Sequence, residues 1–391
     1  MAERTQDDRD AGRFKRPRRG LWIIAGMVLG LVILAILYLV PAWRERSVEH
    51  RLAAIYAAHA LPPGENAATI YNRLLAAYLP EQLRASTRGF PTDFNNVSTL
   101  HLSDEQRMRA FLEAATRPRC FFPALCDSDG PVAAMKWMRS TTAKRTSMMR
   151  LLAWSILRAA LDDLKQGRLD TGKEKLHCAV QIAAHLRQQP TSEDFFTARM
   201  IEDYLWSALG EFIVERDATN EHLVVIEGIL PSLADTWEKE SAEMRQVETL
   251  LDTRSAWQRL GDLLDGAGIQ HAIESGALNY HQIICERRGL RILIELRRYK
   301  NQTGRWPDTL DEVAARLSPE ALSDPLGPAK LAYELDGGGF HLYSMGRNGR
   351  KDASYRDDYP IWPRRGALEW LQERQWEAPQ NTGGQNMMRR R

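Results

Sequence analysis

The sequence predicts a mainly α-helical protein: an N-terminal transmembrane helix, an irregular α-helical bundle, and a small α+β domain made of a helix and a β-hairpin. Residues 21–40 contain no charged side chain, residues 147–189 carry apolar side chains at three- and four-residue spacing, and residues 331–346 form two alternating runs separated by glycines. The net charge of +2 gives no electrostatic footprint for nucleic acid, so no nucleic-acid partner is expected.

Residues 21–40 are predicted to anchor the chain in a membrane. As a helix they extend about 30 Å, the thickness of a bilayer core. Seven basic residues precede them and only three lie in the next twenty positions. By the positive-inside rule residues 1–20 form a cytoplasmic basic tail, and the rest lies outside the cytoplasm on the inner membrane. A cleaved signal peptide is the alternative, with cleavage after the sequence VPA at 40–42, but the apolar run is long for one.

Residues 41–280 are predicted to form the extracytoplasmic helical domain. Gly167 suits a turn between two antiparallel helices, with Asp170 as the next N-cap. Pro190 ends the second helix, and Thr191 or Ser192 caps the third. A further helix is expected over about 232–260. No fixed repeat period appears, so the sequence favours an irregular bundle over a repeat array.

Residues 281–365 are predicted to form the α+β domain, and 366–391 a C-terminal helix or disordered tail. A helix over 282–303 ends at Gly304, because glycine adopts the left-handed conformation that stops a helix. A short helix and a turn, SDPLGP at 323–328, precede the hairpin. The order is therefore helix, short helix, turn, hairpin and polar loop.

Four segments within 282–362 carry a family resemblance: RYKNQTGRWPDTL, DPLG, LAYELDGGGFHLYSMGRNG and DDYPIW. In this order they resemble the C-terminal domain of type II secretion major pseudopilins. The resemblance implies a helix-plus-hairpin domain and partners in an envelope or secretion system. The chain as a whole is similar to membrane-anchored proteins of planctomycete-type bacteria, a likeness that implies no activity.

The N-terminus departs from the pseudopilin pattern. A prepilin has a glutamate at the fifth position after its cleavage glycine, whereas Gly20 is followed by LWIIA, with Ala25 fifth. About 240 residues also separate the apolar segment from the pseudopilin-like part. Both departures argue against a fibre subunit.

The same resemblance implies a calcium site in the loop after the hairpin. Its candidate ligands are Asn348, Asp352, Asp357 and Asp358, since Ca²⁺ takes oxygens from carboxylates, amides and carbonyls. Nearby basic side chains oppose a cation, and a solvated, self-paired loop is the alternative. Ca²⁺ is the one cofactor that the sequence suggests.

Whether the four cysteines form disulfides depends on the compartment in which they lie. In an oxidising compartment Cys120 and Cys126 could form a disulfide that closes a short loop; free buried thiols are the alternative. Cys178 and Cys285 fall on separate predicted helices. The sequence contains no CxxC pair, so a zinc site is not expected.

No catalytic residues are identified. His177 and His185 share a helix without the HExxH pattern, and Ser344 lacks the GxSxG context of a nucleophile. We therefore expect that the protein is not an enzyme. The motifs favour an anchored scaffold or interaction protein, with a type II secretion or pilus-like system as the suggested association. The alternative is a ligand-binding or sensor protein that uses a pocket in the helical domain.

Overall fold

The computed structural model describes residues 27–32, 50–52, 54–55, 57–71, 105–122, 131–251, 269–351 and 358–363. Helices dominate, and a small antiparallel sheet follows them, which confirms the coarse fold class. The longer helices are α3 (Glu105–Thr116), α4 (Pro131–Lys165), α5 (Leu169–Arg187), α6 (Ser192–Glu215), α7 (Asn220–Glu227), α8 (Trp237–Leu251) and α10 (Ile269–Thr303). The short helices and strands are α11 (Asp311–Ala314), α12 (Pro319–Leu322), β1 (Ala332–Asp336), β2 (Gly339–Ser344) and β3 (Tyr359–Trp362).

Only part of the predicted anchor is described. Residues 27–32 are helical, and all but Gly30 have exposed side chains. In the described ranges no helix has both the length and the apolar character needed to cross a membrane. The span over 21–40 therefore stays a prediction.

The helix boundaries follow the local signals with one correction. Gly167 has a φ of 74° and makes the turn between α4 and α5, as predicted. The N-cap of α5 is Arg168, not Asp170. The helix begins at Leu169, so Asp170 lies in its first turn, where a negative charge faces the unpaired N–H groups. Thr191 caps α6 by accepting a hydrogen bond from the Asp194 N–H at 3.2 Å, as predicted.

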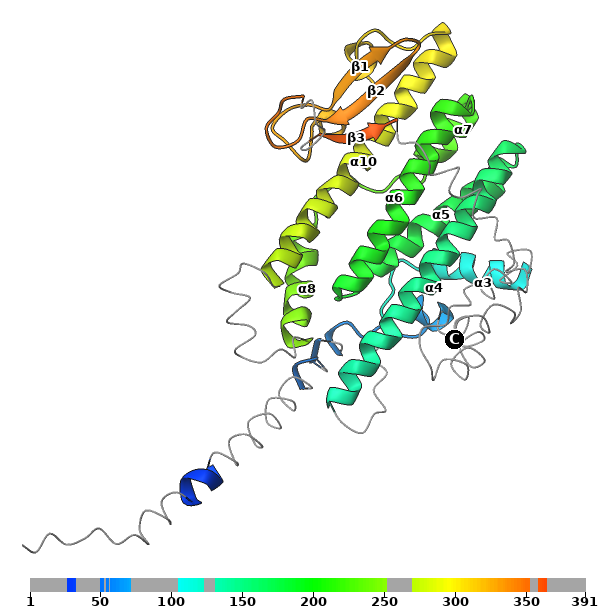
Figure 1. Ribbon diagram of the computed structural model, residues 1–391. Helices are drawn as coiled ribbons and strands as arrows, with labels where there is room; N and C mark the ends of the chain where they lie inside the picture. The colour runs from blue at the N-terminus through cyan, green and yellow to red at the C-terminus, as the bar shows by residue number, and fades with distance from the viewer. Residues whose placement is uncertain are drawn as a thin grey trace, which may run out of the picture.

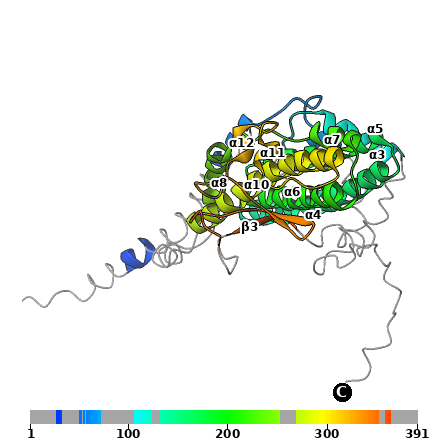
Figure 2. The ribbon, with the colours of Figure 1, turned by 90° about the horizontal axis from the view of Figure 1, so that it is seen from above.

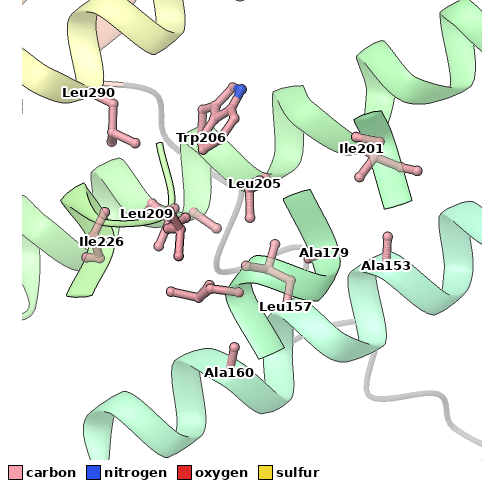
Figure 3. Packing of buried hydrophobic residues seen from close by; sticks show 14 of the residues in the cluster. Ala153, Leu157, Ala160, Ala179, Ile201, Leu205, Trp206, Leu209, Ile226 and Leu290 are labelled. Carbon is pink, nitrogen blue, oxygen red and sulfur yellow. The ribbon is translucent and has the colours of Figure 1, made fainter. Parts of the chain in front are cut away.

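Helix α6 lies between α10 on one side and the α4–α5 pair on the other (Figures 1 and 2). It is apolar on most of its circumference because helices surround it. Figure 3 shows Leu205 of α6 facing Leu157 of α4, while Leu290 of α10 approaches α6 from the opposite side. All three side chains are at most 1% exposed. The centre of the bundle is therefore a packed core.

Helix α10 joins the bundle to the sheet. It packs on α8 and α6 and also on β2 and β3, with the sheet beside its C-terminal half (Figure 1). One continuous core cluster runs from Ala67 to Trp362. The boundary predicted between residues 280 and 281 falls inside α10. The helix ends at Gly304, which has a φ of 81°, as predicted.

The hairpin has the predicted position, and a third strand extends it. Strands β1 and β2 pair antiparallel from Ala332↔Tyr343 to Asp336↔Gly339. Strand β3 adds to the other side of β2, giving the order β1-β2-β3. This third strand was not predicted, because four residues are too short to show a strand period.

Asp324 explains why the DPLG turn and the end of β2 occur together. One carboxylate oxygen accepts hydrogen bonds from Ser344 Oγ at 2.7 Å and from the Met345 N–H at 3.1 Å, and the other accepts from the Leu326 N–H at 2.9 Å. A Cβ on Gly327 would lie 1.9 Å from the Gly346 carbonyl oxygen. The turn therefore needs glycine and rests directly on the strand end.

We expect Asp324→Asn to lower the free energy of unfolding by about 2 kcal/mol, because the amide turns an N–H group toward buried donors. Denaturant titration measures the change. Asp311→Asn is the matched control, since Asp311 is exposed and should change stability by less than about 0.5 kcal/mol. Equal effects of the two substitutions would contradict this role of Asp324.

Candidate ligand-binding cleft

A cleft of about 490 Å³ opens on the side of the bundle. Its walls come from the N-terminal segment at His59, residues 119–121, the end of α5, residues 231–243 and α10 at Arg287. The lining is mixed, with four basic and two acidic side chains among apolar ones. All of its lining residues except Arg287 belong to the predicted helical domain, 41–280, in which a pocket was expected if the protein binds a ligand.

Side-chain amides fix the wall formed by residues 117–122. Asn66 pairs with Phe121 as a strand would: its Oδ1 accepts from the Phe121 N–H at 2.9 Å and its Nδ2 donates to the carbonyl at 2.8 Å. Gln189 accepts from the Phe122 N–H at 3.0 Å and donates to the Cys120 carbonyl at 2.8 Å. Gln188 accepts from the Cys120 N–H at 2.7 Å. The wall is thus rigid although it has no regular secondary structure.

His185 connects this wall to the N-terminal segment. It is fully buried, with Nε2 2.7 Å from the Arg117 carbonyl oxygen and Nδ1 3.0 Å from Tyr71 Oη. These partners assign the neutral tautomer in which Nε2–H donates and Nδ1 accepts from the tyrosine. Burial lowers the pKa of His185 to about 4, although the hydrogen bond to Arg117 opposes this shift.

The least exposed charged side chains of the lining, Arg187, Arg287 and Glu240, form the floor of the cleft, and buried ion pairs join the two arginines to Glu202 behind them. Glu202 of α6 accepts from Arg287 Nη2 at 2.7 Å and Nε at 3.0 Å, and from Arg187 Nη1 at 3.3 Å. Arg187 also donates to both oxygens of Glu240. Burial alone would raise the pKa of Glu202, but Arg287 and Arg187 hold it below its ordinary value. The floor is therefore charged at neutral pH, with each carboxylate matched to an arginine.

The rim carries charges that are less fully matched. Arg119 and Lys239 line the cleft, are exposed, and form no ion pair or side-chain hydrogen bond within the described part of the chain. Glu243 contacts His59 at 3.5 Å. The rim consequently offers two cations to solvent.

The structure describes only two of the four predicted calcium ligands, Asn348 and Asp358. Asn348 is exposed, and its Oδ1 accepts from the Arg350 N–H at 2.7 Å. Asp358 is buried immediately before β3, whereas Asp352 and Asp357 lie outside the described residues. Across the described ranges, no group of three or more His, Cys, Asp or Glu side chains could hold a metal ion. Calcium binding stays a prediction.

The predicted Cys120–Cys126 disulfide also stays a prediction, because Cys126 lies outside the described residues. Cys120 is a buried cysteine at the cleft wall, and Cys178 and Cys285 are buried in the helices. His177, which shares α5 with His185, is exposed. The two histidines thus do not form one site.

Sequence reasoning missed the residues that build the cleft. Glu202 is an acid in the apolar run FFTARMIEDYLWSALGEF, and Arg287 is a base inside the apolar face of α10. A charge at an otherwise apolar helix position was the available signal. Helix periodicity could not show that Glu202 and Arg287 pair with each other, because they are 85 positions apart.

Comparison of the chain with models of known families, with curated proteins and with solved structures finds no match. The resemblance of residues 282–362 to pseudopilins therefore stays a prediction that rests on the four sequence segments.

Proposed function

We propose that this chain is a single-pass membrane-anchored protein whose extracytoplasmic helical region binds a ligand in the cleft, without performing chemistry on it. The observation that carries the proposal is the cleft itself: a volume of about 490 Å³ with polar and charged groups that converge on it. Its rigid wall supports the same conclusion, since a preorganised site loses less conformational entropy on binding.

The anchor rests on the sequence pattern. An uncharged run of twenty residues with basic residues concentrated before it is typical of a single span with a cytoplasmic N-terminus. In that topology the cleft lies outside the cytoplasm.

Thermal unfolding of the full chain in zwitterionic detergent tests ligand binding. The probes are small anionic, cationic, zwitterionic and neutral compounds, each added to wild type and to Ala184→Trp, which fills the cleft. Ala315→Trp on the exposed end of α11 is the matched control. We expect one class of compound to raise the midpoint of wild type and of the control, but not of Ala184→Trp. No response to any class, or an equal response in Ala184→Trp, would contradict the proposal.

A docking scaffold is the second candidate, and the sheet favours it. Strand β2 is central, so β1 and β3 each have one edge without a strand neighbour among the described residues. Leu335 on β1 is 47% exposed. A photocrosslinker at Leu335 in intact cells, with one at exposed Val224 on α7 as control, should capture secretion components only from Leu335. Capture of the same proteins from both positions, or of the chain alone, would refute docking through the sheet.

A further inference from the structure

We propose that the cleft recognises an oxyanion, specifically a phosphate group on a small solute or on a lipid head. This inference rests on the proposed ligand-binding function and specifies its ligand class. It follows from how the charges that line the cleft are matched.

Two of the three acidic side chains at the cleft, Glu202 and Glu240, are already occupied. Both oxygens of Glu240 accept from Arg187, and Oε1 also accepts from Thr236 Oγ1 at 2.6 Å. Glu202 beneath them accepts from two arginines. Glu243 is the remaining carboxylate of the lining, and His59 contacts it. The cleft therefore offers little to a cationic ligand.

Three of the four basic side chains of the lining, Arg119, Lys239 and Arg287, keep unused donors within the described part of the chain. Arg287 donates to Glu202 from Nε and Nη2, and within the described part of the chain its Nη1 has no partner. Its residue surface is only 7% exposed, so this donor is held in place next to the cleft. Above it, Arg119 and Lys239 present two unpaired cations at the rim.

The charges add up to a positive site. Of the lining side chains, Arg119, Arg187, Arg287 and Lys239 contribute +4 and Glu240 and Glu243 contribute −2; Glu202, paired behind the arginines, contributes −1, which leaves +1 without counting His59. An arginine with a free N–H group beside other cations suits an oxyanion, because guanidinium geometry matches phosphate oxygens. Burial of Arg287 strengthens the attraction, since the local dielectric is lower than in water.

Either a soluble phosphate compound or a membrane lipid could supply the group. His59 in the cleft wall lies 19 positions after Val40, the last residue of the predicted span. Both sources are therefore tested.

The experiment uses the full chain in zwitterionic detergent at constant ionic strength and compares two probes. One is inorganic phosphate, with chloride as the matched salt. The other is phosphatidylglycerol added to the micelles, with diacylglycerol, which lacks the phosphate, as the matched lipid. At about 100-fold excess over the dissociation constant, binding should raise the unfolding midpoint by roughly 5 °C. A response to phosphate indicates a solute, and a response to phosphatidylglycerol alone indicates a lipid; both support the proposal.

Charge reversal at the rim localises the site. The double variant Arg119→Glu/Lys239→Glu should lose the response, because it replaces the two rim cations with anions that repel an oxyanion. Both side chains are exposed, so the substitutions leave the buried floor intact. Lys330→Glu/Arg350→Glu is the matched control, with the same charge change at exposed positions near the sheet. It should respond like wild type.

Two results would overturn the oxyanion proposal: no response to either probe, or an unchanged response in the Arg119→Glu/Lys239→Glu variant. These failures are distinguishable from failure of the proposed function. If a neutral or cationic compound raises the midpoint of wild type but not of Ala184→Trp, the cleft is a ligand site and only its assigned chemistry is wrong.

Discussion

Replacing Glu202 with glutamine should lower the free energy of unfolding by about 3–5 kcal/mol. The Glu202 side chain is 4% exposed and pairs with Arg287 and Arg187, whose side chains are 9% and 11% exposed. Glutamine keeps the shape but leaves two guanidinium groups with only Glu240 to balance them. Breaking a buried pair from one side is costly because the remaining charge stays desolvated. Denaturant titration of the full chain in detergent measures the loss.

Glu243→Gln is the control for this prediction. Its side chain is 40% exposed and contacts His59 at 3.5 Å, so stability should change by less than about 0.5 kcal/mol. A second variant, Glu202→Gln with Arg287→Met, should recover part of the loss, because it removes one of the two uncompensated cations. If Glu202→Gln were as mild as Glu243→Gln, the buried cluster would not support the floor of the cleft.

Stability should fall by about 3 kcal/mol between pH 6.5 and pH 4 because of His185. Its pKa in the folded protein is about 4, below the ordinary value of 6.5. Between these two values the unfolded chain binds a proton that the folded chain does not bind, so acid favours unfolding. Above pH 6.5 the histidine is neutral in both states and its contribution is constant.

Unfolding at pH 7.5 and pH 4.5 in wild type and His185→Gln isolates this contribution. Glutamine can keep a donor toward Arg117 and an acceptor toward Tyr71 but takes up no proton. We expect the variant to lose about 2–3 kcal/mol less than wild type between the two pH values. His177→Gln, at an exposed position of the same helix, should behave like wild type. Equal pH dependence in all three proteins would contradict the assignment of neutral His185.

The sequence predicted elements whose signals are local. Gly167 and Gly304 end helices because only glycine adopts their positive φ at little cost, and Thr191 caps α6 through a hydrogen bond three residues away. The hairpin was predicted because its two alternating runs are adjacent. Strand β3 was not, since its pairing with β2 depends on a loop between them and not on its own four residues.

The cleft could be predicted only as a location. Its parts come from segments far apart, such as Asn66 with Phe121 and Glu202 with Arg287, which are separated by 55 and 85 positions. Burial converts an ordinary charge such as Glu202 into part of a matched network, and a single sequence does not show which charges are buried. The calcium prediction, which rests on the pseudopilin resemblance, stays untested because Asp352 and Asp357 lie outside the described residues.

The central claim is that the cleft of an anchored protein faces the outside of the cytoplasmic membrane. Labelling of Lys239→Cys by a membrane-impermeant maleimide in spheroplasts tests it most directly, with Cys126 replaced by serine and Arg9→Cys as the cytoplasmic control. Buried Cys120, Cys178 and Cys285 should contribute little background. We expect position 239 to be labelled in intact spheroplasts and position 9 to be labelled only after lysis. Labelling of position 9 in intact spheroplasts, with position 239 labelled only after lysis, would contradict it.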